Sequence, residues 1–305
     1  MYFRTARETN KNKLPLGISI KRSWLDNAQR WFLAIFKVKR SLFGGIWIAI
    51  MIFSAIFAPE ISPFDPYEQN IGNMFASPGF KHWLGTDYLG RDLLARMIYG
   101  CRIAMLVSFG SITISSMVGV FLGMLAGYNE GKKIDYVIIF IFDTIRSIPQ
   151  IVLAIALIAV VGPSLRNLIL VMAFSGFPFW GRIARAQALV AKEFDYVKSA
   201  VAMGLKRNKI IFRHIMPNIL TPIIACLGME LAWMIVYEAG LSFLGLGVIP
   251  PTASWGIMLR NGYKYIDISP WMILWPAFAI AMAMLAFSFF SEGLKNALDP
   301  KQRER

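Results

Sequence analysis

EFDYVKSAVAMGLKRNKIIFRHIMPN, residues 193–218, is a basic, water-soluble stretch between two segments that are apolar enough to cross a lipid bilayer. Apolar residues recur at helical spacing over 193–203, and Gly204 follows where a left-handed helix cap favours glycine. A second helical run, 205–216, carries four basic residues and precedes Pro217, which suits the first turn of a further helix. The stretch therefore predicts a helix, a glycine hinge and a second helix.

The composition is that of a membrane protein. The chain has 305 residues, of which 56% are hydrophobic and 16% charged, and its mean hydropathy is +0.53. Such a chain is too apolar for an ordinary soluble domain. We expect an all-α, polytopic fold with six transmembrane helices, formed by uncharged runs at 42–58, 103–128 and 271–290 and by less regular segments at 136–161, 168–180 and 219–247.

The positive charges predict the orientation. Residues 1–41 hold ten Lys and Arg against two acids, and residues 181–216 hold eight against two. Residues 59–102 hold four against five, and 248–270 hold two against one. Because basic loops stay in the cytoplasm, both termini and the 193–218 stretch are expected there. The net charge of +14 is then a topology signal with some attraction to anionic lipid, and no base-reading motif suggests a nucleic acid.

Several kinds of site are excluded by the sequence. Cys101 and Cys226 are far apart in apolar surroundings, so they suggest packing and neither a disulfide nor a metal site. No Ser/His, paired Asp or HExxH arrangement lies within the spans, so no catalytic residue is expected. The first apolar run starts only at Leu42 without a cleavage signal, and we expect this helix to stay as an anchor.

Two spans carry features that predict close packing or function. Ser115, Gly119, Gly123 and Gly127 fall at four-residue intervals and give the second span one face without bulk, where another helix can approach. In the third span, an acid and a base stand one turn apart before a proline, at Asp143, Arg146 and Pro149. They predict an ion pair and a kink at membrane depth, where charge is expensive and is usually kept for function.

The fourth span is short. Gly176 and Pro178 interrupt it, and an amphipathic, basic run then continues the helical period towards Glu193. Such a helix suits the protein interior better than lipid, beside a water-filled path, and would lead mechanically into the 193–218 stretch.

Three further stretches resemble one known family. Residues 82–102, HWLGTDYLGRDLLARMIYGCR, resemble the signature before the second span in the dipeptide and oligopeptide branch of ABC permeases. Residues 238–256, EAGLSFLGLGVIPPTASWG, resemble that branch's E-x-x-LSFLGLG segment followed by P-x-x-x-SWG. Residues 292–300, EGLKNALDP, resemble its C-terminal ending.

The 193–218 stretch resembles the EAA loop of ABC-importer permeases, whose pattern is E-A-A, three residues, G and then a hydrophobic-Leu-Pro ending. Lys198 stands in place of the glutamate, Ser199 in place of the first alanine and Met216 in place of the leucine. The resemblance implies that residues of this loop couple the chain to an ATPase: Glu193, Tyr196, Val197, Ser199, Ala200, Gly204 and Pro217.

The chain is thus identified, by resemblance, as a C-type permease subunit of dipeptide, oligopeptide or nickel ABC importers, with the type I ABC-importer permease fold. This implies a second, B-type permease subunit, two cytoplasmic ATP-binding subunits, an extracytoplasmic solute-binding protein and a bacterial inner membrane around a multi-pass chain. The sequence has no P-loop GxxxxGK[ST]. We therefore expect no cofactor in this chain, with ATP and magnesium bound by the partner ATPases.

The resemblance and the charges together suggest two more groups of site residues. Candidates for a gate or pathway are Asp143, Arg146, Pro149, Glu230, Glu238, Ser242 and Phe243. The extracytoplasmic family motif comprises Gly85, Thr86, Asp87, Gly90, Arg91 and Asp92, and Arg91 and Arg96 are the expected local partners of its two aspartates.

The predicted organisation has four parts. A basic cytoplasmic arm, 1–41, contains apolar residues at helical spacing between Trp24 and Ile35, which predict a helix lying on the membrane or one packed on the inner ends of the bundle. The first span and an extracytoplasmic segment follow at 42–102. A five-helix permease domain, 103–293, contains the coupling loop 181–217, and a cytoplasmic tail occupies 294–305.

Two functions of other classes compete with the importer. An ion-coupled secondary transporter would use Asp143, Glu230 and Glu238 as a relay, but no inverted repeat of the spans is visible. An intramembrane enzyme would need a catalytic constellation that the spans lack. The cargo stays open between di- and oligopeptides, nickel or other metal chelates, and antimicrobial peptides.

Overall fold

The computed structural model describes residues 38–298, and within that range the chain is almost entirely helical. An isolated β-bridge joins Thr86 to Asp92 in a loop, and no strand is formed between residues 38 and 298. The prediction of an all-α membrane fold is confirmed. The predicted helix between Trp24 and Ile35 lies outside the described residues, as does the end of the predicted tail.

Between residues 38 and 298, five helices are long and apolar enough to cross a membrane. They are α2 (Lys39–Ile56), α4 (Leu93–Tyr128), α7 (Leu165–Lys192), α10 (Met216–Phe243) and α12 (Trp271–Leu298). A sixth span is formed if α5 (Lys133–Arg146) and α6 (Gln150–Val161) are counted together, although the two meet at an angle of 87°. Six described elements are short: α3 (Ala58–Ile61), the 3-10 helix η1 (Ile71–Asn73), α8 (Asp195–Ala202), α9 (Arg207–Ile210), the π-helix η2 (Ile211–Ile215) and α11 (Trp255–Lys264).

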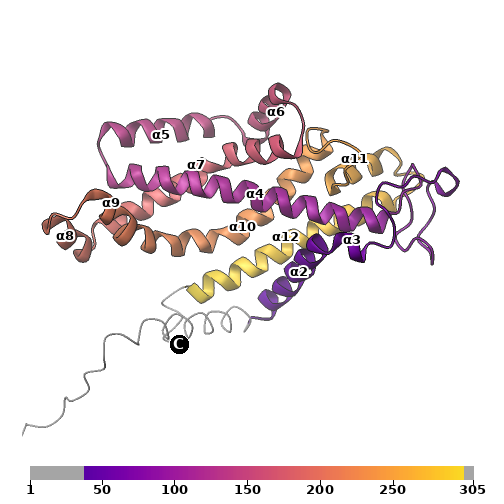
Figure 1. Ribbon diagram of the computed structural model, residues 1–305, viewed down its shortest axis with the longest axis horizontal. Helices are drawn as coiled ribbons and strands as arrows, with labels where there is room; N and C mark the ends of the chain where they lie inside the picture. The colour runs from indigo at the N-terminus through magenta and orange to yellow at the C-terminus, as the bar shows by residue number, and fades with distance from the viewer. Residues whose placement is uncertain (1–37, 299–305) are drawn as a thin grey trace, which may run out of the picture.

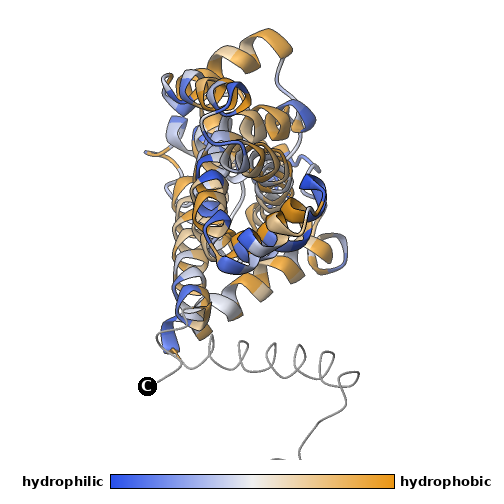
Figure 2. Cartoon of the chain, turned by 90° about the vertical axis from the view of Figure 1, so that its left-hand side faces the viewer, coloured by the Kyte–Doolittle hydropathy of each residue, from blue (hydrophilic) through white to orange (hydrophobic). Residues whose placement is uncertain are grey.

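The bundle is elongated and has two distinct ends (Figure 1). The end that carries α8 and α9 is called the loop end here, and the opposite end, with α3, α11 and the segment before α4, the cap end. α2 starts, and α12 finishes, on the side towards the loop end, as an even number of crossings requires. Figure 2, which views the chain from the loop end, shows hydrophilic patches in the connecting segments and hydrophobic stretches along the helices.

α4 and α7 run side by side through the centre of the bundle and make the most extensive contact of any helix pair between residues 38 and 298 (Figure 1). A Cβ added at Gly119 would lie 2.8 Å from the Cβ of Trp180, and one at Gly123 would lie 2.9 Å from the Cα of Gly181. A Cβ at Gly127 would lie 2.8 Å from the Cβ of Ala188. The predicted face without bulk is confirmed, and its partner is α7.

The third predicted span is broken where one helix was expected. α5 ends at Arg146, and Pro149 precedes α6 in an extended conformation with φ −53° and ψ 131°. Proline disfavours the helical conformation in the residue before it and donates no hydrogen bond, so Pro149 favours a kink or break at Ile148. The predicted kink is thus confirmed, as a bend of 87°.

Pro217 lies in the first turn of α10, so the sequence-based prediction is confirmed, but α10 is not separated from the helical turns before it. The helical run is continuous from Arg207 to Phe243, and the π-turn η2 at 211–215 lies just ahead of the proline. Because proline lacks an N–H group, a helix that contains one needs a local rearrangement of its hydrogen bonds. The π-turn η2, which ends at Ile215 directly before α10, supplies that rearrangement.

The α4–α7 contact predicts a position-specific effect of adding one methyl group. Gly123→Ala forces the two backbones apart and should destabilise the protein by about 1–3 kcal/mol. Gly240→Ala is the matched control, since nothing lies within 4 Å of a Cβ at that helical glycine. Thermal unfolding of the purified protein should show a lowered midpoint for Gly123→Ala alone, and equal midpoints would contradict the assignment.

Candidate functional site

The loop end is built by α8 and its glycine cap. The amide of Leu205 donates to the carbonyl of Ala200, and the amide of Gly204 donates to the carbonyl of Val201. Gly204 has φ +70°, so these two bonds form a Schellman cap that needs a left-handed residue. The prediction of a helix, a glycine hinge and a second helix is confirmed, with α8 spanning Asp195–Ala202.

α8 is amphipathic, with one buried face and one exposed face that is also apolar. Val197 and Ala200, each only 1% exposed, pack inwards. The outward side presents large apolar groups, and these form the loop surface: Phe194, Tyr196, Val201 and Met203. Met203 is 72% exposed, which is unusual for a long apolar side chain in water.

Charged side chains frame this surface. The Lys198 ammonium lies 2.9 Å from the Glu193 carboxylate. The hydrogen bond from Lys198 holds the pKa of Glu193 below its ordinary value, and the same bond raises the pKa of Lys198. Lys198, which replaces the glutamate of the EAA pattern, thus has its counter-ion within the loop.

Residues 193–210, which contain α8, its glycine cap and α9, form the loop unit. This unit is attached to the spans on both sides. Only Glu193 and Phe194 separate α7 from α8, and both of their amides donate to carbonyls of the last turn of α7. On the other side, the Arg207 guanidinium lies over the ring of Tyr128 at the end of α4, 5.3 Å from its centroid. The structure therefore brings six of the predicted coupling residues into one unit, whereas Pro217 lies apart in the first turn of α10.

A second candidate site is a cavity of about 440 Å³ beside the α5–α6 break. Twelve residues from the end of α5, the break, α6, α7 and α10 line it: Ile145, Arg146, Ile148, Pro149, Gln150, Leu153, Ser175, Gly176, Phe179, Met229, Glu230 and Trp233. Three predicted pathway residues, Arg146, Pro149 and Glu230, are therefore brought together here. The sequence indicated each of these residues, but not that all three line the same cavity.

Hydrogen bonds fix the wall of this cavity. The Tyr237 hydroxyl of α10 donates to the backbone carbonyl of Gln150, at 2.8 Å. The side chain of Gln150 lies 3.4 Å from the Ser175 hydroxyl of α7. The break between α5 and α6 is thus held from two sides, and Tyr237, Gln150 and Ser175 are residues that the sequence analysis missed.

The ion pair predicted between Asp143 and Arg146 is wrong. Asp143 pairs instead with Arg182 of α7, and both side chains are about half exposed. A second ion pair links the same helices near the loop end, where Arg185 binds both carboxylate oxygens of Asp135 at 2.8 and 2.9 Å. Arg182 and Arg185 stand three residues apart and so share a helix face, which is the signal that could have indicated them.

The remaining pathway candidates lie elsewhere. Glu238 and Ser242 are fully buried near the cap end of α10, where the serine hydroxyl donates to the carboxylate at 2.6 Å. Phe243, at the end of α10, packs edge-to-face against Tyr263. Ser254 caps α11, and the indole of Trp255 donates to the Met97 carbonyl of α4, so this motif joins α10, α11 and α4 at the cap end.

The motif before α4 folds on itself. Asp87 pairs with Arg91 at 2.7 Å, as expected, and Arg96 lies 3.6 Å from the same carboxylate. The expected Arg96 partner for Asp92 is wrong, because Asp92 accepts from the Ala95 amide as the cap of α4 and pairs with His82 at 2.8 Å.

Three more residues of this motif, Gly85, Gly90 and Thr86, shape the backbone around that cap. The two glycines have φ +85° and +70°, and Thr86 accepts from the Ala76 amide, so all three serve the fold of the cap end.

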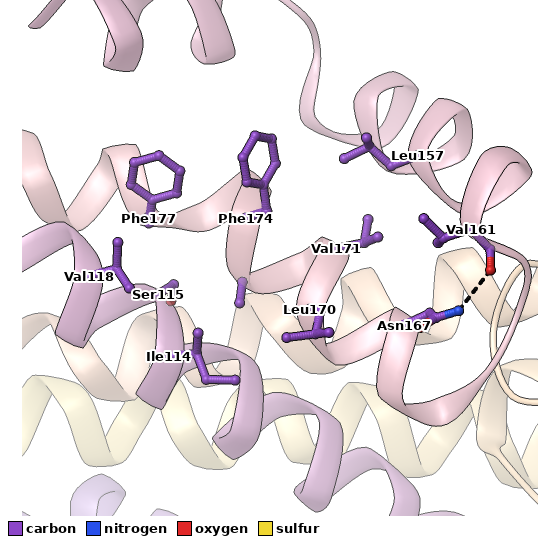
Figure 3. Close-up of a pocket in the computed structure, with 11 residues that line it drawn as sticks. Ile114, Ser115, Val118, Leu157, Val161, Asn167, Leu170, Val171, Phe174 and Phe177 are labelled. Atoms are coloured by element: carbon purple, nitrogen blue, oxygen red, sulfur yellow. Dashed lines mark hydrogen bonds between the residues drawn. The ribbon is translucent and has the colours of Figure 1, made fainter. Parts of the chain in front are cut away.

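Another cavity, of about 590 Å³, is mostly apolar and lies between α4, α6 and α7 (Figure 3). Its only side-chain hydrogen bond drawn in Figure 3 runs from the Asn167 amide to the Val161 carbonyl, at 2.9 Å. No charged residue lines it, so it suits hydrocarbon and offers nothing to select a polar cargo.

Comparisons with known proteins agree with one another. Residues 119–304 match the family described as binding-protein-dependent transport system inner membrane component, and residues 28–78 match the N-terminal transmembrane domain of oligopeptide transport permease C. The dipeptide transport system permease protein of Alkalihalophilus pseudofirmus is 39% identical over 272 residues, 89% of each chain. The di/tripeptide permease of Pseudomonas aeruginosa is 35% identical over 86% of this chain and 88% of its own. The oligopeptide permease of Bacillus subtilis is 35% identical over 87% of each.

The partners of Asp143 predict the outcome of two double-mutant cycles. Asp143→Asn and Arg182→Gln remove the same ion pair, so their effects on stability should be non-additive by about 0.2–1 kcal/mol, the range for half-exposed pairs. Asp143→Asn and Arg146→Gln should be additive. Thermal unfolding of the purified protein measures both cycles. Coupling between Asp143 and Arg146, without coupling between Asp143 and Arg182, would show that Asp143 pairs within α5 and would contradict the structure.

Proposed function

The chain belongs to the family of binding-protein-dependent transport system inner membrane components, and we propose that it is the permease subunit of an ABC importer for di- or oligopeptides. Relatives that are 35–39% identical over most of the chain are named as dipeptide, di/tripeptide and oligopeptide permeases. The observation that carries the coupling part of the proposal is the loop surface, an exposed apolar patch on a short helix fixed rigidly to α7.

The proposed importer needs partners for energy and for capture of the cargo. A second, B-type permease subunit completes the path, two ATP-binding subunits dock on the loop ends, and a solute-binding protein delivers the cargo at the cap end. The chain itself has no P-loop, so ATP and magnesium belong to the ATPase subunits. The host membrane is the bacterial inner membrane.

In this proposal the loop surface lies in a groove of an ATPase subunit. Closure of the ATPase pair moves α8, and the two-residue connection passes that movement to α7. Because the loop surface binds the ATPase differently in its nucleotide states, this difference in binding free energy shifts the inward and outward populations of the bundle.

The structure offers no support for an ion relay through the three predicted carboxylates. Asp143 pairs with Arg182, Glu238 is buried with Ser242, and Glu230 lines the cavity, so the three occupy separate environments. A metal-chelate cargo stays an alternative, although residues 38–298 contain no cluster of three or more His, Cys, Asp or Glu able to hold a metal ion. ATP-dependent uptake that survives a protonophore would favour the importer over the relay.

Orientation is tested by cysteine labelling at exposed positions. In a Cys226→Ala background, a membrane-impermeant maleimide should label Lys81→Cys and Asp267→Cys in intact cells, because the cap end faces outwards. Lys206→Cys should be labelled only after permeabilisation, since basic loops stay inside. Cys101 is buried and can be left in place. Labelling of position 206 in intact cells would reverse the orientation.

Coupling is tested at Gly204. Nothing lies within 4 Å of a Cβ built there, so a substitution acts only through the left-handed backbone. Gly204→Val should cost about 1–2 kcal/mol in the cap, enough for a roughly ten-fold loss of peptide uptake and of uptake-coupled ATPase activity. Gly204→Asn is the matched control, because asparagine tolerates positive φ. Normal uptake by an assembled Gly204→Val complex would argue against coupling through this loop.

A further inference from the structure

The cavity beside the α5–α6 break contains one cation and one anion that do not pair. Arg146 and Glu230 both line it, yet no nitrogen–oxygen distance of 4.0 Å or less joins them. Across residues 38–298 neither of the two has another side-chain ion pair. The nearest acid in sequence, Asp143, is held by Arg182. The two charged side chains can therefore bind a ligand inside the cavity.

The position of Glu230 within its span makes an unpaired charge there costly unless it serves binding. Glu230 lies near the midpoint of α10, about 20 Å from either end at 1.5 Å per residue. Arg146 ends α5 at the break and opens onto the same cavity. Ionisable side chains in the middle of a span are kept where they face a water-filled path or a ligand.

We propose that this cavity is a binding station for zwitterionic peptides, in which Arg146 binds the terminal carboxylate and Glu230 binds the terminal ammonium group. This inference rests on the proposed importer function and names the chemistry that its path recognises. A free peptide carries both charges, separated by about 3.3–3.6 Å per residue. The cavity, about 440 Å³, is within the range of small-ligand sites.

The remaining walls suit a cargo whose side chains vary. Ile148, Met229 and Trp233 are apolar and about half exposed, and methionine adapts easily to different shapes. Gln150 and Ser175 supply polar groups at the rim of the break. The two charged side chains thus bind the two termini that all free peptides share, whereas the apolar wall accepts cargo side chains of different shape.

Trp233 allows the proposal to be tested by its fluorescence in the assembled transporter, purified with its partner subunits but without the binding protein. Trialanine should change the emission of the wild-type complex, and Trp233→Phe should remove that change. Arg146→Gln and Glu230→Gln should each weaken trialanine binding at least about ten-fold, the loss expected for one charge-assisted contact.

End-capped peptides assign each charge to one terminus. Trialanine amide should bind the wild type about as weakly as trialanine binds Arg146→Gln, and Arg146→Gln should not weaken the amide further. N-acetyl-trialanine should behave in the same way towards Glu230→Gln. Arg182→Gln is the matched control, since it removes an arginine that pairs with Asp143 and does not line the cavity, and it should leave the affinity within about two-fold.

Three outcomes would overturn the proposal. Capped peptides that bind as tightly as trialanine would show that the cavity does not recognise the charged termini. Equal weakening of all three peptides by Arg146→Gln and Glu230→Gln would mean that the charges maintain the architecture. Unchanged affinity with reduced assembly would mean that they pair with the second permease subunit.

Failure of this inference is distinguishable from failure of the importer function. ATP-dependent uptake of trialanine by wild-type proteoliposomes supplied with the binding protein tests the function alone. If uptake occurs but free and capped peptides bind equally well, the importer function is supported and the proposed zwitterion site is rejected. Selective binding without uptake would remove the importer function and with it the role of the cavity as a station on a transport path.

Discussion

Backbone contact between α4 and α7 is the constraint on which the rest of this structure depends. Lipid supplies no hydrophobic driving force between helices, so a stable pair needs close van der Waals packing over small residues. Gly119, Gly123 and Gly127 provide it, and α7 meets them with Gly181 and Ala188. α5 then packs against both helices, and the ring of Phe142 lies where a Cβ of Gly181 would stand. The helix that carries the loop surface and one wall of the cavity is therefore fixed in the middle of the bundle.

Features that depend on neighbouring residues in sequence were predictable, because their physics is local. The spans follow from runs of apolar residues, the face of α4 from four-residue spacing, and the cap of α8 from a glycine that tolerates positive φ. The third span was also predicted to bend, because Pro149 removes a helix hydrogen bond and disfavours the helical conformation before it. In each case one stretch of chain contains the whole cause.

Partners across helices were not predictable from the same sequence. Arg146 stands one turn after Asp143 and looked like its counter-ion, but it ends α5 and opens onto the cavity, while Asp143 meets Arg182 of α7. Helical spacing shows which residues share a face of one helix, yet it does not tell which other helix covers that face. The bond from Tyr237 to Gln150 joins positions 87 residues apart and had no local signal at all.

The two halves of the loop lead to α7 and α10, which both line the same cavity, and this gives the proposed coupling a physical route. From α8 the chain runs back through α7 to Phe179 and Ser175, and from α9 it runs forward through η2 and α10 to Met229 and Glu230. Pro178 lies inside α7 and removes one helix hydrogen bond at the level of the cavity, where bending costs least. A movement of the loop unit thus acts on both walls together, and the spacing of Arg146 and Glu230 depends on those walls. In the proposed importer, the affinity of the cavity for a zwitterion would change with the position of the loop.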